Sequence, residues 1–281
     1  MTADLSDPAR LAHALQLVEQ ADLLVIAAGA GMGVDSGLPD FRGNEGFWRA
    51  YPALGRAGLD FVEIANPEAF RRDPALAWGF YGHRLALYRR TRPHAGFAIL
   101  RRWGERCERG ALVYTSNVDG QFQCAGFDEA QVWECHGSLL HLQCSRPCGD
   151  EVWSAEGFEP EVDESACRLL NEAPRCPRCG ALARPNVLMF GDGQWVDPRE
   201  RAQSRELLPR LRAARKPLVI ELGAGTAVPS VRRFGQQVLR ELNGRLLRIN
   251  LREPQVPSPR DLGLAMGALD ALQQLDAALG G

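Results

Sequence analysis

Eight cysteines occur in the 281-residue chain, and four of them form two close pairs. The stretch "CSRPC" contains Cys144 and Cys148, and "CPRCG" contains Cys176 and Cys179. Turn residues within each pair allow its two thiolates to point at one ion, and four thiolates leave no open position on a tetrahedral zinc. The spacing therefore predicts a structural zinc site. The alternative is two pairs of free cysteines in loops.

A second candidate for chemistry is the glycine-rich stretch "GAGMGVDSGLPDFRG", residues 29–43, which directly follows the apolar run "ADLLVIAA". A glycine-rich turn after a strand lets backbone N–H groups approach a pyrophosphate, and the N-terminus of a following helix favours its negative charge. The glycines alone are a weak signal because Val34 occupies the third glycine position of the dinucleotide fingerprint. The end, "PDFRG", adds a carboxylate, an aromatic ring and a guanidinium, which suit a ligand with sugar hydroxyls, a flat ring and phosphates.

The apolar runs of the chain predict the framework that positions these groups. Runs typical of buried strands occur at residues 22–28, 110–116, 131–135, 216–223 and 245–251. Helical patterns occur at residues 6–21, 93–106 and 231–243. The first of these helices has Ser6 or Asp7 as its candidate cap. Strands that alternate with helices predict an α/β fold with a doubly wound, Rossmann-like parallel sheet.

Two stretches interrupt this alternation and predict a smaller lobe inserted into the sheet domain. Residues 46–92 are aromatic-rich and helical in period, whereas residues 138–185 are rich in Cys, Pro and Gly and contain the cysteine pairs. We expect the first stretch to form a helical part and the second a zinc-ribbon part. The Rossmann-like domain would then comprise residues 1–45, 93–137 and 186–281.

The net charge and the length of the apolar stretches indicate whether the protein binds nucleic acid or a membrane. The formal net charge is −2, from 33 Lys plus Arg against 35 Asp plus Glu, so nothing in the balance favours nucleic acid or an anionic membrane. Arginine runs such as "YRRTRPH" are read as solvated helix faces, with a nucleic-acid patch as the alternative. Neither a signal peptide nor an apolar stretch of membrane-spanning length is evident. We expect a cytoplasmic monomer without disulfides.

Further motifs follow the glycine-rich stretch in a fixed order. They are "TSNVD" at 115–119, "HGS" at 136–138, the two cysteine pairs, "RPNVLMFGD" at 184–192, "GAGTAVP" at 223–229 and "RIN" at 248–250. In this order over most of the chain, the motifs resemble those of the sirtuins, the silent-information-regulator family of NAD-dependent protein deacylases. The resemblance implies an enzyme that releases nicotinamide and O-acyl-ADP-ribose, with NAD as co-substrate and acyl-lysine proteins as partners.

The resemblance also implies roles for the matched residues. His136 would be the catalytic base, and a histidine at a strand end can accept a proton at cellular pH. Asn117 and Asp119 would act with it by holding the nicotinamide carboxamide. Val187, Phe190 and Gly191 would contact substrate. The residues implied for NAD binding are Gly29, Ala30, Gly31, Asp40, Phe41, Arg42, Ser116, Asn117, Asp119, Gly223, Ala224 and Asn250.

Three departures from the family pattern are expected at ligand contacts. Ser116 replaces the family's Gln, Asp192 replaces the Glu of "FGE", and the 223–229 loop is shorter than usual and lacks the serine of its family counterpart. Together they weaken the inference to ordinary deacetylation more than the inference to NAD binding. Mono-ADP-ribosylation of proteins and simple NAD hydrolysis therefore stay open as alternatives.

The helical stretch "FYGHR" places Tyr81 and Arg84 three positions apart, on one helix face. In a subset of sirtuins a matching pair recognises acidic acyl groups such as succinyl-lysine. By that resemblance, Arg84 would stand without a partner in an apolar channel until a carboxylate arrives, and would then form a charge-assisted bond. The alternative is an ordinary Tyr and Arg on an amphipathic helix.

Three other classes of protein would have different sequence features or different products. A Rossmann dehydrogenase would use NAD reversibly and would need neither "PDFRG" nor the cysteine pairs. A zinc-ribbon nucleic-acid binder would need a basic face, which the net charge does not indicate. An NAD hydrolase or ADP-ribosyltransferase would share the NAD site without transferring the acyl group, so product analysis separates it from a deacylase.

Overall fold

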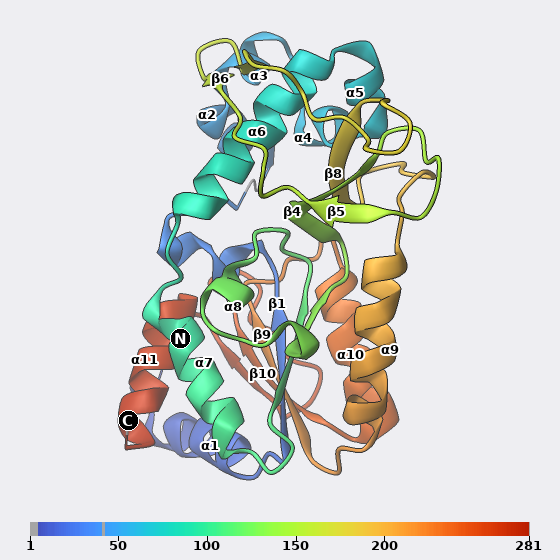
Figure 1. The fold of residues 1–281 in the computed structure, drawn as a ribbon. Coiled ribbons are helices and arrows are strands. Elements are labelled where there is room, and N and C mark those ends of the chain that lie inside the picture. Colours follow the sequence, from blue (N-terminus) through green and yellow to red (C-terminus); the bar gives the residue numbers. More distant parts are fainter. Residues whose placement is uncertain (1–4, 41–42, 281) are drawn as a thin grey trace.

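The computed structural model describes residues 5–40 and 43–280, and its larger part is built on one parallel sheet (Figure 1). The strand order is β11-β10-β9-β1-β2-β3. These strands span β1 Leu23–Ala28, β2 Ala111–Thr115, β3 Val132–Glu134, β9 Pro217–Leu222, β10 Arg245–Ile249 and β11 Leu262–Leu264. Because β1 pairs in parallel with both β2 and β9, the winding direction reverses beside it. Such a switch point opens a crevice at the carboxyl ends of the strands.

Helices cover both faces of this sheet. In Figure 1, α1 (Pro8–Glu19), α7 (Ala95–Arg106) and α11 (Ala268–Ala278) lie on one side, and α9 (Pro198–Arg212) and α10 (Ser230–Leu242) lie on the other. Every residue of β1 is buried. Its alternate side chains enter two separate cores: Ile26 packs with the first set of helices and Val25 with the second. The continuous apolar run in the sequence reflects this two-sided burial.

Above the carboxyl edge of the sheet lies a smaller lobe (Figure 1). Its helices are α2 Gly43–Ala50, α3 Pro52–Arg56, α4 Phe61–Ile64, α5 Pro67–Arg72 and α6 Pro74–Arg90. Its antiparallel sheet has the order β5-β4-β8, and a separate ribbon pairs β6 with β7. These strands span β4 Gly137–Cys144, β5 Val152–Ser154, β6 Val162–Asp163, β7 Arg168–Leu169 and β8 Ala183–Val187. Helices and strands share one core, in which Trp78 and Phe80 of α6 join Leu139 and Leu142 of β4.

The predicted α/β class with a doubly wound parallel sheet and a smaller inserted lobe is confirmed. The first helix begins after Asp7, whose side chain accepts a hydrogen bond from the backbone of Ala9, so Asp7 rather than Ser6 is the cap. The predicted strands all form, whereas α9, α11 and β11 were not predicted. The domain limits at 46, 93, 138 and 186 stay a prediction.

One local prediction is wrong. The glycine-rich turn after β1 does not lead into an α-helix but into two 3₁₀ helices, η1 Ala30–Met32 and η2 Val34–Ser36. Glycines at every second position up to Gly33 disfavour a helix, and Gly37 ends the segment in the left-handed conformation, with φ of 85°. The turn therefore offers loop backbone, and not a helix N-terminus, to the crevice.

Two further short helices lie among the described residues: α8 is Gln121–Cys124 and η3 is Glu129–Gln131. Within 5–40 and 43–280, no helix combines the length and the apolar character needed to cross a membrane.

Candidate functional site

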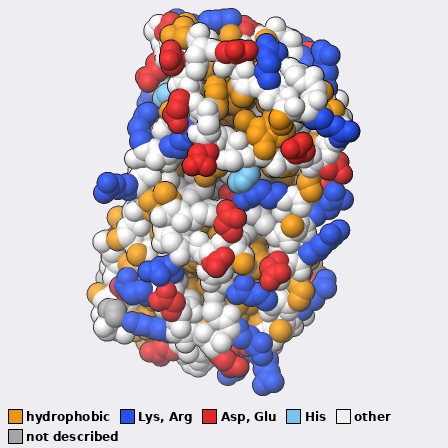
Figure 2. Space-filling view, in the orientation of Figure 1, with side chains coloured by type: hydrophobic (Ala, Val, Ile, Leu, Met, Phe, Trp, Pro, Cys, Tyr) orange, Lys and Arg blue, Asp and Glu red, His pale blue; other side chains and the backbone are white. Residues whose placement is uncertain are grey.

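A cavity of about 760 Å³ lies between the carboxyl edge of the sheet and the smaller lobe. The sheet side contributes the loops that follow β1, β2, β9 and β10, and the lobe contributes α4, α6 and the segment after β8. Figure 2 shows hydrophobic side chains gathered on the smaller lobe on one face of the molecule. Exposed Val62, Leu188 and Phe190 belong to the cavity wall. The cavity therefore combines polar loops below with an apolar wall above.

His136 lines this cavity in the two-residue link between β3 and β4. Its ring is held from two sides. One nitrogen bonds to the backbone of Ser116, and Nε2 lies 2.9 Å from Oγ of Ser230, the first residue of α10. Burial lowers the pKa of His136 below its usual value. The ring is therefore neutral at neutral pH and can accept a proton.

Asn117 and Asp119 reach the cavity from the loop after β2. The Asn117 side chain donates to the carbonyl oxygen of Gly29 at 3.0 Å, which ties this loop to the glycine-rich turn. Asp119 accepts a hydrogen bond from the backbone N–H of Gln121 at 3.0 Å. Burial raises the pKa of Asp119 to about 6, an effect that the positive charge of Arg84 opposes without cancelling.

The two glycine-rich loops lie against each other at the switch point. The N–H of Gly31 donates to the carbonyl oxygen of Gly223 at 3.1 Å. Gly223 has a φ of 59°, and a Cβ there would lie 2.4 Å from the backbone of Gly31. Only glycine allows this close approach.

Most residues implied for NAD or substrate reach the cavity, and some do not. Those that line it are Gly29, Ala30, Asp40, Tyr81, Arg84, Ser116, Asn117, Asp119, His136, Val187, Phe190, Gly223 and Ala224. Among the described residues, Gly31, Gly191 and Asn250 are outside the lining. Asn250 is buried instead, and its amide donates to the carbonyl oxygen of Ala224 at 2.8 Å. Phe41 and Arg42 lie outside the described residues.

The expectation that Asp192 contacts a ligand is wrong. Its carboxylate lies 2.8 Å from the guanidinium of Arg184, and both side chains are almost completely inaccessible to solvent. Asp192 also accepts a hydrogen bond from the backbone N–H of Gln194 at 3.1 Å. The carboxylate thus neutralises a buried arginine and shapes the loop after β8, so its replacement of Glu is not an argument against deacylation. Ser116 and the loop starting at Gly223 do reach the cavity.

Tyr81 and Arg84 both line the cavity from α6, as their spacing predicts. The expectation of a guanidinium without a partner is wrong, because Nε and Nη2 of Arg84 donate to the hydroxyl of Tyr88 at 2.9 and 2.7 Å. Tyr88 follows Arg84 by four positions and thus lies on the same helix face. The guanidinium also lies over the rings of Phe80 and Tyr81, at 5.2 and 5.8 Å from their centroids.

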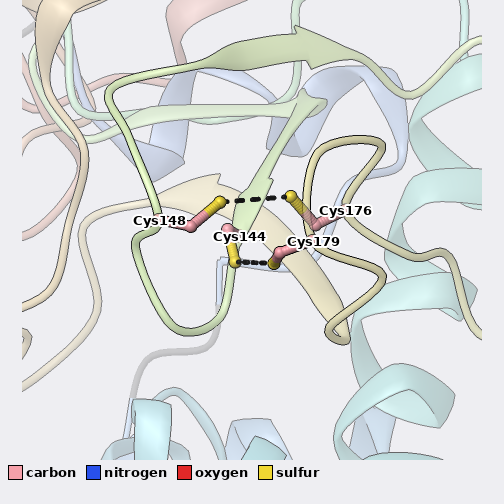
Figure 3. Close-up of side chains that lie close together, drawn as sticks. All are labelled: Cys144, Cys148, Cys176 and Cys179. Carbon is pink, nitrogen blue, oxygen red and sulfur yellow. Dashed lines mark hydrogen bonds between the residues drawn. The ribbon is translucent and has the colours of Figure 1, made fainter.

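The four predicted cysteines converge at the far end of the antiparallel sheet (Figure 3). The Sγ atoms of Cys144 and Cys179 are 3.7 Å apart, and those of Cys148 and Cys176 are 3.6 Å apart. All four sulfur atoms lie within 4.8 Å of one another. A tetrahedron with Zn–S bonds of about 2.3 Å has edges of about 3.8 Å, so this cluster fits a zinc ion. Four thiolates fill the tetrahedron, which makes the ion structural.

Several cavity residues were not predicted. Thr226, Arg252 and Glu253 line its sheet side, and the hydroxyl of Thr226 donates to the carboxylate of Glu253 at 3.0 Å. Arg252 and Glu253 follow β10 just as Asp119 follows β2, so the rule that ligands bind beyond strand ends could have found them. Tyr88 also lines the cavity, whereas Ser230 contacts His136 from outside the lining. Neither had a signal in the sequence, because each is identified only by its contact with a residue already named, Arg84 or His136.

A crevice of this kind in a doubly wound sheet binds nucleotides or similar ligands, which places the protein among the ligand-binding α/β proteins. Residues 29–207 match the family model described as "Sir2 family". The chain is 31% identical over 251 residues to an NAD-dependent protein deacylase of Pyrococcus furiosus, covering 89% of each chain. It is 30% identical to the same kind of protein of Thermococcus kodakarensis, covering 94% of each. The chain therefore belongs to the Sir2 family, as the motifs predicted.

Solved structures agree on the fold. A Sir2 homolog–NAD complex superposes with a TM-score of 0.74 at 23% identity, covering 100% of this chain and 96% of that one. A Sir2 protein bound to a propionylated peptide superposes with a TM-score of 0.66 at 22% identity, covering 96% and 99%. At these identities the likeness establishes the shared fold alone.

Proposed function

We propose that the protein is an NAD-dependent protein-lysine deacylase that releases nicotinamide and O-acyl-ADP-ribose. The observation that carries the proposal is the neutral His136, held at the junction of the polar loops and the apolar wall. Relatives at 30–31% identity over about nine-tenths of the chain carry the name NAD-dependent protein deacylase, which supports the same activity. We also propose a cytoplasmic monomer; the net charge of −2 supports only the part of this proposal that excludes a nucleic-acid partner.

The two sides of the cavity suit the two substrates. The loops at Gly29 and Gly223 present backbone to a pyrophosphate, and Asn117 with Asp119 would hold the nicotinamide carboxamide. Val187 and Phe190 on the apolar wall would flank the acyl-lysine chain. NAD supplies the sugar to which the acyl group moves. His136 would accept a proton from a ribose hydroxyl, a step that commonly contributes about 10²- to 10⁴-fold to a rate.

We further propose that acidic acyl groups such as succinyl are preferred. Arg84 brings a buried positive charge to the cavity, where Nε and Nη2 donate to the Tyr88 hydroxyl and the charge also acts on Asp119. A carboxylate on the acyl chain would add a further opposite charge beside the guanidinium. A hydrogen bond to a charged group contributes about 1.5 to 3 kcal/mol, which corresponds to a preference of about 10- to 150-fold in kcat/KM over acetyl.

Product analysis tests both proposals. The protein is incubated with NAD and either acetyl- or succinyl-lysine peptide, and the products are identified by mass spectrometry. O-acyl-ADP-ribose with free lysine is the expected result. ADP-ribose with intact peptide would indicate an NAD hydrolase, and an ADP-ribosylated peptide would indicate a transferase, and either would refute deacylation.

Substituting Arg84 tests acyl selectivity separately. R84M is expected to lower desuccinylation about 10- to 150-fold and to leave deacetylation equal or faster, because an acetyl group makes no use of the charge. R90M, an exposed arginine at the end of the same helix, is the matched control and should change neither rate. A wild-type preference for acetyl-lysine, or equal slowing of both reactions in R84M, would show that the pair is structural.

A further inference from the structure

Ser230 makes a contact that the proposed mechanism does not yet use. Its Oγ lies 2.9 Å from Nε2 of His136, across 94 positions of the chain. The other ring nitrogen bonds to the backbone of Ser116, a contact that raises the pKa of the ring, as expected when the ring N–H donates to a carbonyl oxygen. That proton therefore sits on Nδ1, and Nε2 carries the lone pair. The Ser230 hydroxyl must then be the donor to Nε2.

Both ring nitrogens of His136 are thus engaged before any substrate arrives. A ribose hydroxyl could deliver its proton directly only after the Ser230 bond to Nε2 is broken and the ring or the serine has moved. A hydroxyl group, however, donates and accepts at the same time. Ser230 can receive one proton at Oγ while passing its own to Nε2, and no ring movement is needed.

Ser230 is placed where such a transfer is feasible. It begins α10, it is half-buried, and the next residue, Val231, lines the cavity together with His136. The loop that leads into α10 also lines the cavity through Val228. Ser230 itself is not among the lining residues, but its hydroxyl contacts His136 and its chain neighbours Val228 and Val231 reach the ligand space.

We propose that Ser230 is the proton relay between the substrate ribose hydroxyl and His136. The inference rests on the proposed deacylase function and adds a catalytic residue to it. In the step, the ribose O–H bond breaks: its electron pair forms the new bond from the ribose oxygen to the acyl carbon, and its proton bonds to Oγ of Ser230. The Ser230 O–H bond breaks and its proton bonds to Nε2. The imidazolium then donates from Nε2 to Oγ, and its Nδ1–H keeps its bond to Ser116, so each proton is accounted for.

The decisive experiment compares S230A with S230T. S230A removes the hydroxyl and is expected to lower kcat about 10- to 100-fold, at or below the lower limit of what loss of acid–base catalysis costs, because His136 can still accept a proton after reorienting. NAD affinity, measured by calorimetry, should stay within about twofold. S230T restores the hydroxyl and should recover most of kcat. S204A, which removes a serine hydroxyl that bonds within α9, is the matched control.

The other outcomes overturn the relay. Unchanged kcat in S230A would mean that His136 receives the proton directly. Equal slowing in S230A and S230T, with normal melting temperatures, would mean that Ser230 acts through packing. Failure of the proposed function is distinguishable, because wild type would then release no O-acyl-ADP-ribose. In that case the ¹⁵N spectrum of His136 still tests the contact: Nε2 should shift in S230A and recover in S230T, and an unchanged Nε2 signal would refute the bond itself.

Discussion

Asp119 shares a cavity with Arg84 and His136, and its ionisation is expected to limit the stability of the fold. Its pKa is raised to about 6 in the folded protein, against about 3.9 in an unfolded chain. The folded state therefore binds this proton more tightly. The corresponding stabilisation is fully present below pH 4 and is lost as the pH rises through 6, at a cost of up to about 3 kcal/mol.

D119N should therefore be more stable than wild type at neutral pH and equally stable near pH 4. The difference in the free energy of unfolding is expected to reach about 3 kcal/mol above pH 7, since the amide carries no charge to desolvate. Urea unfolding between pH 4 and 8 measures it. E129Q, at an exposed acidic residue, should show no such pH-dependent gain. A gain for D119N that is the same at every pH would contradict the assignment of the raised pKa.

At the scale of elements, the site depends on two loops that touch through glycine. G223A should weaken folding by about 2 to 4 kcal/mol, because the added methyl group meets the backbone of Gly31 and alanine disfavours the left-handed conformation. NAD binding should fall with it, since the loops would separate. G157A is the matched control, for Gly157 lies outside the cavity lining and a Cβ there meets nothing within 4 Å. Urea unfolding and calorimetry would show the contrast, and equal losses in both variants would contradict it.

The elements that could be predicted from sequence are those with a local signal. Strand β1 is apolar at each position because it is buried on both faces, and the cap of α1 is an Asp followed by Pro. Helix α9 was missed because it is strongly polar and buries only Leu207 and Leu211. The three-residue β11 is too short for a pattern, and Gly263 interrupts it.

The residues of the candidate site were likewise predictable only where the sequence carries a local signal. His136 and the cysteines stand in motifs, so their types and spacing were informative. The roles of Asp192 and Ser230 could not be predicted, because Asp192 depends on a buried arginine and Ser230 on a contact across 94 positions. Tertiary packing decides which polar groups meet, and one sequence carries no signal for such pairs.

For the whole molecule, the cavity joins two bodies that have separate cores. Among the residues that the structure describes, the parallel sheet and its helices form two cores that include no residue of the smaller lobe. The lobe has its own core, in which Leu142 of β4 packs with Val187 and Met189 at the cavity wall. Because β4 ends at Cys144 and pairs with β8, the zinc site and the apolar wall share the same strands.

Loss of zinc should therefore abolish deacylation by unfolding the smaller lobe, while the parallel sheet stays folded. One zinc per chain is expected in wild type and none in C176S, because the binding energy of a structural zinc is part of the folding energy of its lobe. Hydrogen exchange in C176S should rise in β4, β5 and β8 and stay low in β1 and β9, while deacylation is lost. C124S, at an exposed single cysteine, should keep both zinc and activity. Absence of zinc from freshly purified wild type, or equal loss of protection in both sheets, would contradict this division of the molecule.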